Sequence, residues 1–209
     1  LKSYAPDVMF TEMIKFIEGC KEQPFFFYWA SPIPHAALQA PRRWVDYYVN
    51  KFGDEAPYLG KAGYFPHRYP HAAYAAMISY LDERVGQLVQ KLKDEGMYEN
   101  TLIIFSSDNG PTYNGGTDSP WFNSGGPFKS ERGWAKGFLH EGGIRVPMIA
   151  SWPGKIAPGS ESDHISAFWD LLPTLCEVAG ADIPENVDGL SYLPELLGEE
   201  DQDLHAHLY

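Results

Sequence analysis

Asp108 and Asn109 are adjacent residues whose side chains could together hold a metal ion. They follow the apolar run Thr101–Ser107 and precede Gly110, which allows the backbone to turn tightly. One carboxylate and one amide oxygen are hard ligands, which suit Ca²⁺ or Mg²⁺ better than zinc. Asp-Asn-Gly is also a good turn sequence, so a turn without metal is the alternative interpretation.

His35 and Lys136 are two further candidates for chemistry. His35 comes shortly after the aromatic run Pro24–Ala30, in a stretch of prolines and small residues. It could contact a substrate, or it could be a loop histidine packed on aromatic neighbours. Lys136 lies between alanine and glycine, so no bulky neighbour would hinder an anion from reaching it. The alternative is a solvated surface lysine.

Three apolar runs predict the strands that would position these residues. Pro24–Ala30 and Thr101–Ser107 are short and uniformly apolar, as in buried strands, and Val146–Ser151 is the third. Ligands of open α/β sheets gather outside the carboxyl ends of the strands. We therefore expect His35 and the Asp108–Asn109 pair at one edge of the sheet.

Helices are predicted between these strands. Apolar residues recur at helical spacing over Asp7–Cys20 and Ala72–Glu95, and Ser166–Ala179 is a third helical stretch that could start afresh near its proline. Arg42–Pro70 is expected to be an irregular, aromatic-rich excursion, and Asp108–Lys136 a long loop of the kind that is often functional. The alternation predicts an α/β layered sheet with a largely parallel core.

Composition narrows the class of protein. The chain has 16 Lys and Arg against 28 Asp and Glu, a formal net charge of −12, which is unsuited to coating nucleic acid. The acidic excess lies in Glu161–Asp203, which contains no Lys or Arg and is expected to be a solvated face.

No apolar run is long enough to span a bilayer, and Leu1–Phe10 is not a signal peptide. Cys20 and Cys176 form no disulfide framework. Oligomeric state stays open.

Four motifs in order resemble the formylglycine-dependent sulfatases of the alkaline phosphatase superfamily. They are PFFFYWASPIPHAALQAP, TLIIFSSDNGP, AKGFLHEGGIRVPMIASWPG and the aspartate-leucine-leucine-proline-threonine run at Asp170–Thr174. The chain looks most similar to bacterial arylsulfatase A-like and N-acetylgalactosamine-6-sulfatase-like members. The resemblance implies an alkaline phosphatase-like layered sheet flanked by helices, and hydrolysis of sulfate esters of glycans or aryl alcohols.

The resemblance also implies roles for individual residues. Asp108 and Asn109 match the Asp-Asn metal ligands of the family, usually to Ca²⁺, with Mg²⁺ as a second option. Lys136 matches the lysine that contacts the sulfate, and His35 matches the histidine near the leaving oxygen. Both are therefore expected to be catalytic and substrate-binding residues. Family members are usually exported, so the resemblance implies a periplasmic or secreted protein.

The chain departs from the family at the nucleophile. Formylglycine arises from the Cys, or an equivalent Ser, of Cys-x-Pro-Ser-Arg, and no such motif occurs here. Residues 1–209 are therefore expected to be a partial sulfatase catalytic domain that lacks the amino-terminal part and the carboxyl-terminal subdomain, and to be inactive alone. The alternatives are a phosphatase or phosphodiesterase of the same superfamily and a non-catalytic binding domain derived from a sulfatase. Asn109 stands where the phosphatases favour histidine, which argues against the first.

Overall fold

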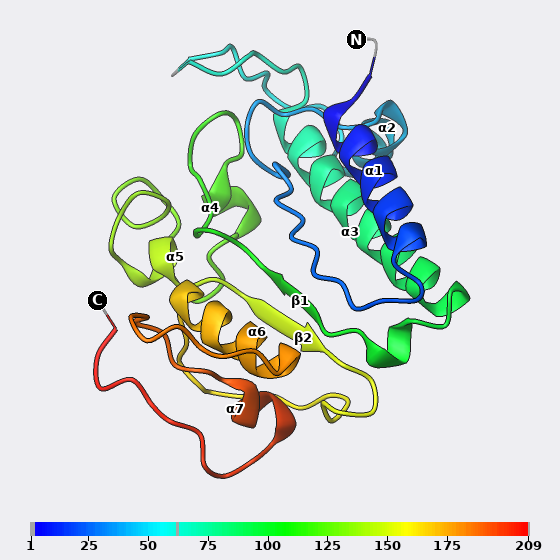
Figure 1. Cartoon of the computed structure of the whole chain (residues 1–209). Coiled ribbons are helices and arrows are strands. Elements are labelled where there is room, and N and C mark those ends of the chain that lie inside the picture. Colours follow the sequence, from blue (N-terminus) through cyan, green and yellow to red (C-terminus); the bar gives the residue numbers. More distant parts are fainter. Residues whose placement is uncertain (1–2, 62, 209) are drawn as a thin grey trace. The chain divides into compact units, whose positions relative to one another are not determined.

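The computed structural model describes residues 3–61 and 63–208. The chain divides into two compact units, and Figure 1 shows its helices and strands. Unit 1 combines the residues up to Met97 with Ser106–Met148, and it contains all four candidate site residues. Unit 2 combines Tyr98–Phe105 with the residues from Ile149 onward. The helices and small sheet are those of a partial α/β domain.

Three helices form the body of unit 1: α1 (Ala5–Gly19), α2 (Arg42–Phe52) and α3 (Pro70–Asp94). The predictions of α1 and α3 from apolar spacing are confirmed. Pro70 at the first turn suits the start of α3, because its missing N–H has no partner in a helix there anyway. The core side chains of α3 include Met77 and Tyr80, which are 3% and 1% exposed.

Helix α2 corrects the expectation that Arg42–Pro70 is irregular throughout. Trp44 and Tyr48 lie one turn apart and both reach α3: Trp44 Nε1 donates to Glu83 at 3.0 Å, and the Tyr48 hydroxyl lies 2.7 Å from Ser79 Oγ. Arg43 pairs with the same Glu83 carboxylate. Packing on α3 therefore stabilises a short helix whose own sequence is only weakly apolar.

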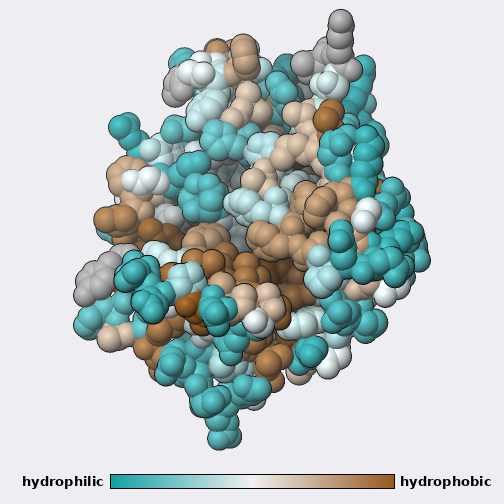
Figure 2. All heavy atoms as spheres, viewed as in Figure 1, coloured by the Kyte–Doolittle hydropathy of each residue, from teal (hydrophilic) through white to brown (hydrophobic). Residues whose placement is uncertain are grey.

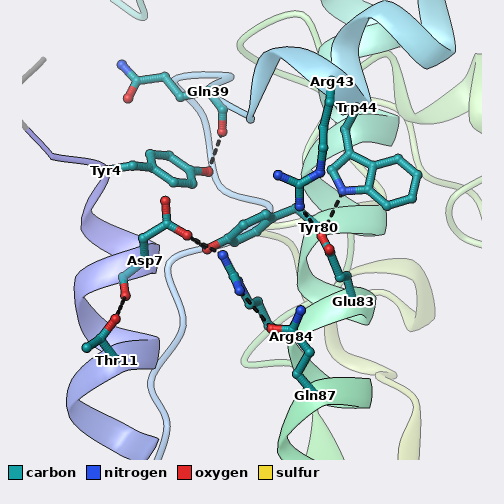
Figure 3. A network of polar contacts seen from close by, with 10 residues as sticks. All are labelled: Tyr4, Asp7, Thr11, Gln39, Arg43, Trp44, Tyr80, Glu83, Arg84 and Gln87. Atoms are coloured by element: carbon teal, nitrogen blue, oxygen red, sulfur yellow. Dashed lines mark hydrogen bonds and ion pairs between the residues drawn. The ribbon is translucent and has the colours of Figure 1, made fainter.

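Helices α1 and α3 are joined by a polar network (Figure 3). The Asp7 carboxylate accepts from the Tyr80 hydroxyl at 2.6 Å and from Arg84 Nη2 at 2.5 Å. The Arg84 guanidinium also lies 4.8 Å from the ring centroids of Phe10 and Tyr80. Burial, and then the hydrogen bond to Asp7, raise the pKa of Tyr80 to about 12. The phenol is therefore neutral at physiological pH and acts as the donor.

The segment Pro24–Ala30 is extended, but it is not the buried strand that its sequence predicts. Phe26 and Tyr28 are 69% and 79% exposed, while the intervening Phe27 ring lies 5.3 Å from that of Phe16 in α1. One face of the segment thus packs on α1 and the other is open. A strand needs a hydrogen-bonded neighbour, and no described residue supplies one along this segment.

The sheet of the described residues has two strands, β1 (Ile103–Ser106) and β2 (Met148–Ser151), and both were predicted. Ser106 Oγ donates to Pro147 O at 2.9 Å, and Gly110 N donates to Gly143 O at 2.9 Å. The partner number falls as the chain advances, so the two segments are antiparallel, as the arrows in Figure 1 show. The prediction of a largely parallel core is therefore wrong for this pair.

Unit 2 contains two longer helical segments. A 3₁₀ turn, Phe168–Asp170, leads directly into α6 (Leu171–Ala179), and α7 (Leu193–Leu197) follows. A second 3₁₀ turn, Tyr98–Asn100, precedes β1. The predicted helix Ser166–Ala179 is thus confirmed in its second half, and the chain turns tightly just before it.

Asp170 joins several segments of unit 2 through hydrogen bonds. It lies in Glu161–Asp203, which was expected to be a solvated acidic face. Its carboxylate is fully buried and accepts from Ala167 N at 2.7 Å and Leu190 N at 2.9 Å, and His205 Nε2 lies 2.7 Å away. The aspartate-leucine-leucine-proline-threonine motif therefore has a structural role here. Burial raises the pKa of the neighbouring Tyr192 to about 12, and the Asp170 charge adds to the shift.

Two further predictions bear on the class of protein. Within residues 3–61 and 63–208, no helix is both long and apolar enough to cross a membrane. Cys20 is buried and Cys176 is half-buried, and both are free thiols. Apolar side chains also reach the surface at many places, as the brown spheres of Figure 2 show.

Candidate active site

The Asp108–Asn109–Gly110 turn directly follows β1. Asp108 is exposed, and its carboxylate has no hydrogen-bond or salt-bridge partner among the described residues. Asn109 Nδ2 donates to Gly110 O at 2.8 Å, which fixes the amide and leaves its oxygen available. Ser107 Oγ donates to Asn109 O at 3.0 Å and braces the turn from behind. The two candidate ligands therefore offer an unpaired carboxylate and a free amide oxygen.

Gly110 brings this turn against the glycine motif that precedes β2. Gly110 N donates to Gly143 O at 2.9 Å, and a Cβ built on Gly110 would lie 2.0 Å from Gly142 O. A side chain at Gly110 would therefore force the two segments apart. The motif containing Asp108 and the motif containing Lys136 are thus neighbours in space.

Lys136 is held beside the same turn. Its backbone N–H donates to Pro111 O at 3.0 Å, one residue beyond Gly110. Lys136 is half-buried, and its ammonium forms no salt bridge with any carboxylate in the described part of the chain. A charged side chain whose backbone is fixed and whose ammonium is unpaired is suited to bind an anion.

His35 approaches this region on a separate loop. Ile33 and Leu38 are both buried in the core and anchor the loop at either side of His35, which is itself exposed. The following residue, Ala36, lies so close to Gly115 that a Cβ on that glycine would be 2.6 Å from the alanine Cβ. The His35 loop therefore touches the long loop that follows Asp108 and Asn109. Asp108, Asn109 and Lys136 are thus joined through Gly110 and Pro111, whereas the described contacts of the His35 ring are with Tyr64 and Ala36 O and not with these three residues.

The donor set fits a hard cation but is incomplete. Ca²⁺ takes six to eight oxygen ligands, and Mg²⁺ takes six. Asp108 and Asn109 supply oxygens of the right kind, whereas no group of three or more His, Cys, Asp or Glu among the described residues is placed to hold a metal. These two residues would hold such an ion only together with further ligands.

Contacts among Glu55, His71 and Asp118 hold the long loop after Asp108 against α3, and they were not predicted from the sequence. Glu55 caps α3, accepting from His71 N at 2.8 Å and from Ala72 N at 3.0 Å. The His71 ring lies between Glu55 at 3.1 Å and Asp118 at 3.0 Å, and it stacks on Trp121 with 4.3 Å between centroids. The sequence signal was Asp-Ser-Pro at Asp118, a helix-start pattern that gives the short α4 (Ser119–Phe122).

The four-residue helix α5 (Glu141–Ile144) contains the glycines that the Lys136 loop packs against. A Cβ on Gly142 would lie 1.9 Å from Lys129 O, and a Cβ on Gly143 would lie 2.6 Å from Ala135 O. The glycines of this motif are therefore required by close backbone packing. Glu141 pairs with Arg145 at 3.2 Å, which fits a bracing role for that carboxylate.

Comparison with known proteins identifies the family of this chain. The Sulfatase family model matches residues 2–181. The chain is 32% identical over 206 residues to N-acetylgalactosamine-6-sulfatase of Canis lupus familiaris, covering 97% of this chain and 34% of that protein. It is 34% identical over 179 residues to arylsulfatase A of Homo sapiens, covering 85% of this chain and 30% of that protein. The chain thus spans about a third of the length of these relatives.

Solved structures of other proteins are also similar to this chain. Ps i-CgsB, crystallised with k-i-k-neocarrahexaose, superposes with a TM-score of 0.76 at 31% identity, covering 95% of this chain and 39% of that one. The protein yidJ from Bacteroides fragilis superposes with a TM-score of 0.71 at 28% identity, covering 98% of this chain and 43% of that one. These neighbours confirm the alkaline phosphatase-like fold class expected from the sequence. By sequence and by structure, this chain belongs to the sulfatase family and corresponds to a fragment of its catalytic domain.

Proposed function

We propose that this chain is part of a sulfatase that hydrolyses sulfate esters of glycans or aryl alcohols. The observation that carries the proposal is the close approach of two motifs: Gly110 N donates to Gly143 O at 2.9 Å, and Lys136 N donates to Pro111 O at 3.0 Å. In support, the backbone of Lys136, whose ammonium has no salt bridge in the described chain, is hydrogen-bonded next to the turn that contains Asp108 and Asn109. Named relatives that act on sulfated sugars and aryl sulfates support the same substrate class.

Each of the four residues has a role in this proposal. Lys136 neutralises charge on the sulfate oxygens and holds the ester in place. His35 is exposed on a loop that touches the region, and it protonates the oxygen of the departing alcohol. Asp108 and Asn109 contribute two oxygens to a metal ion, Ca²⁺ or Mg²⁺, that the family generally requires. When bound, the ion polarises the sulfate as a Lewis acid.

The nucleophile is expected outside these residues. The family generally uses formylglycine, and the motif from which it is made does not occur in residues 1–209. The whole protein is proposed to be periplasmic or secreted, in keeping with exported members of the family. A phosphatase or phosphodiesterase of the same superfamily stays the alternative, since a phosphonate monoester hydrolase is also a structural neighbour, with a TM-score of 0.52 at 27% identity.

Binding of inorganic sulfate and phosphate to the chain tests the proposal directly. We expect sulfate to perturb the Lys136 resonances in an NMR titration, and Lys136→Ala to abolish the response. Lys155→Ala is a matched control, since Lys155 is an exposed lysine in unit 2. Sulfate binding that is insensitive to Lys136→Ala would contradict the proposal, and a clear preference for phosphate would favour the alternative.

A further inference from the structure

Three cations without a salt bridge in the described chain lie close together in the sequence at Lys129–Lys136. Lys129, Arg132 and Lys136 form no salt bridge with any carboxylate of residues 3–61 and 63–208. Most other cations of unit 1 do, such as Arg84 with Asp7 at 2.5 Å and Lys91 with Glu18 at 2.6 Å, although Lys51 and Lys61 also form none among the described residues. Two carboxylates, Glu131 and Glu141, lie in or near the same stretch, and neither pairs with these three cations. A cluster of cations that lacks acidic partners creates a local positive potential that attracts anions.

Two of the neighbouring side chains are ordered around an aromatic ring. Lys129 Nζ lies 4.3 Å from the centroid of the Trp134 ring, and the His140 ring lies 4.3 Å from it with a 31° tilt. All three residues are exposed, and Trp134 is 39% exposed. Cation–π contact restrains the lysine without using its N–H groups. None of the three side chains has a hydrogen-bond partner in the described structure.

This cluster belongs to the same packed turn as Lys136. Trp134 is two residues from Lys136, so their Cα atoms are at most about 7 Å apart. The backbone carbonyls of Lys129 and Trp134 both pack against Gly142. A Cβ on Gly142 would lie 1.9 Å from Lys129 O and 2.9 Å from Trp134 O. The cluster is thus held in place by the backbone contacts that position the candidate active site.

We propose that Lys129, Trp134 and His140 form a subsite that binds a second sulfate group of the substrate, on the sugar flanking the one held by Lys136. The donors are Nζ of Lys129, the ring N–H of His140 and Nε1 of Trp134. A sulfate ester has three terminal oxygens that can accept from separate side chains, whereas a planar carboxylate is better matched by an arginine fork. Trp134 also offers an amphipathic ring to a sugar. The inference rests on the proposed function, and it narrows the substrate to a multiply sulfated glycan.

Two disaccharides that differ only in a second sulfate provide the test. Their affinities for the 209-residue chain are measured by calorimetry at low ionic strength, because exposed charge pairs are screened by salt. We expect tighter binding of the disulfated sugar. Lys129→Gln should lower its affinity about two- to fivefold more than that of the monosulfated sugar, as expected for one exposed charge pair. Trp134→Phe, which removes the indole donor, should act in the same direction.

The matched control is Lys155→Gln. Lys155 Nζ lies 5.0 Å from the Trp152 ring, so this variant removes the same charge from another lysine–tryptophan pair. It should not change the ratio of the two affinities. Equal affinities of the wild-type chain for the two sugars, or an equal loss for both in Lys129→Gln, would overturn the subsite. Lys136→Ala separates the two proposals: if it leaves the binding of both sugars unchanged, the sulfate site itself is wrong and the subsite falls with it.

Discussion

At the scale of single residues, the candidate site depends on charges that have no partner within the described chain. The Asp108 carboxylate and the Lys136 ammonium are both free of salt bridges there. Groups of this kind gain nothing for folding from their charge, so their substitution should affect ligands more than stability. The roles assigned to them are therefore open to tests by binding.

The isolated chain should bind Ca²⁺ only weakly. Asp108 and Asn109 supply few of the six to eight oxygens that the ion takes, so we expect a Kd no tighter than about millimolar. Calorimetric titration of the 209-residue chain measures this. A stoichiometric micromolar site that disappears in Asp108→Ala would contradict the prediction and show that other oxygens complete the shell.

Much of this site could be predicted from local sequence. Asp108, Asn109 and Gly110 form a turn at a strand end because glycine follows two side chains that tolerate turns. His35 was expected beside this turn because Pro24–Ala30 would be a strand of the same sheet, and that reason is wrong. The His35 loop instead touches Gly115 through Ala36, a contact between residues far apart in the sequence that forms only once the core has packed.

At the scale of elements, long helices were the most predictable part. Helices α1 and α3 each have a clear apolar stripe, whereas α2 is short and depends on contacts with α3 that no local pattern reveals. For Pro24–Ala30 the sequence predicted an element, a buried strand, that does not form. Its sequence favours a strand, but strand formation also depends on a neighbouring segment.

Gly110→Ala should destabilise unit 1 by about 1–3 kcal/mol, since a backbone oxygen would lie where the new methyl group must go. Gly86→Ala is the control, because Gly86 lies in α3 with nothing within 4 Å of its Cβ position. It should stabilise the protein by about 0.5–1 kcal/mol, since alanine is the better helix former. Urea unfolding of both variants measures the difference. Wild-type stability of Gly110→Ala would show that the turn adapts.

Glu83 should make the attachment of α2 sensitive to acid. The hydrogen bond from Trp44, followed by the Arg43 interaction, holds the pKa of the Glu83 carboxyl below its usual range. A carboxyl with a lowered folded pKa stabilises the native state above its unfolded pKa of about 4.3, and this contribution is lost as the pH falls through the folded value.

Glu83→Gln should therefore cost about 1 kcal/mol at pH 7 and less at pH 3. Urea unfolding at the two pH values gives both numbers. Asp46→Asn is the control, because Asp46 is a more exposed carboxylate on α2 and its side chain is 60% exposed. Its effect should stay below about 0.5 kcal/mol. An equal cost of Glu83→Gln at both pH values would show that its charge is irrelevant.

At the scale of the molecule, the chain is two compact units with different characters. Unit 1 contains every proposed site residue, and unit 2 contains the acidic excess and is organised around buried Asp170. Net charge and the class of fold could be anticipated from the sequence. The division into units could not, because it depends on which segments pack together after folding.

The 209-residue chain alone should not hydrolyse sulfate esters, because the sequence contains no formylglycine motif. Nitrocatechol sulfate, followed by absorbance, is a sensitive probe, and the expected rate is that of the buffer. Turnover that co-purifies with the chain and is lost in Lys136→Ala would refute this expectation. Arylsulfatase A, the relative at 34% identity, is a positive control for the assay.

The open segment Pro24–Ala30 has a consequence for how the isolated chain behaves in concentrated solution. Phe25–Ala30 is six apolar residues without proline, and its backbone has few partners among the described residues. Such segments template aggregation by pairing with copies of themselves. Tyr28→Lys, at a side chain that is 79% exposed, should delay the growth of thioflavin fluorescence, whereas Tyr47→Lys, on α2 and 51% exposed, should not. Tyr28, which stays exposed in the folded chain, would then limit how long the purified chain remains soluble.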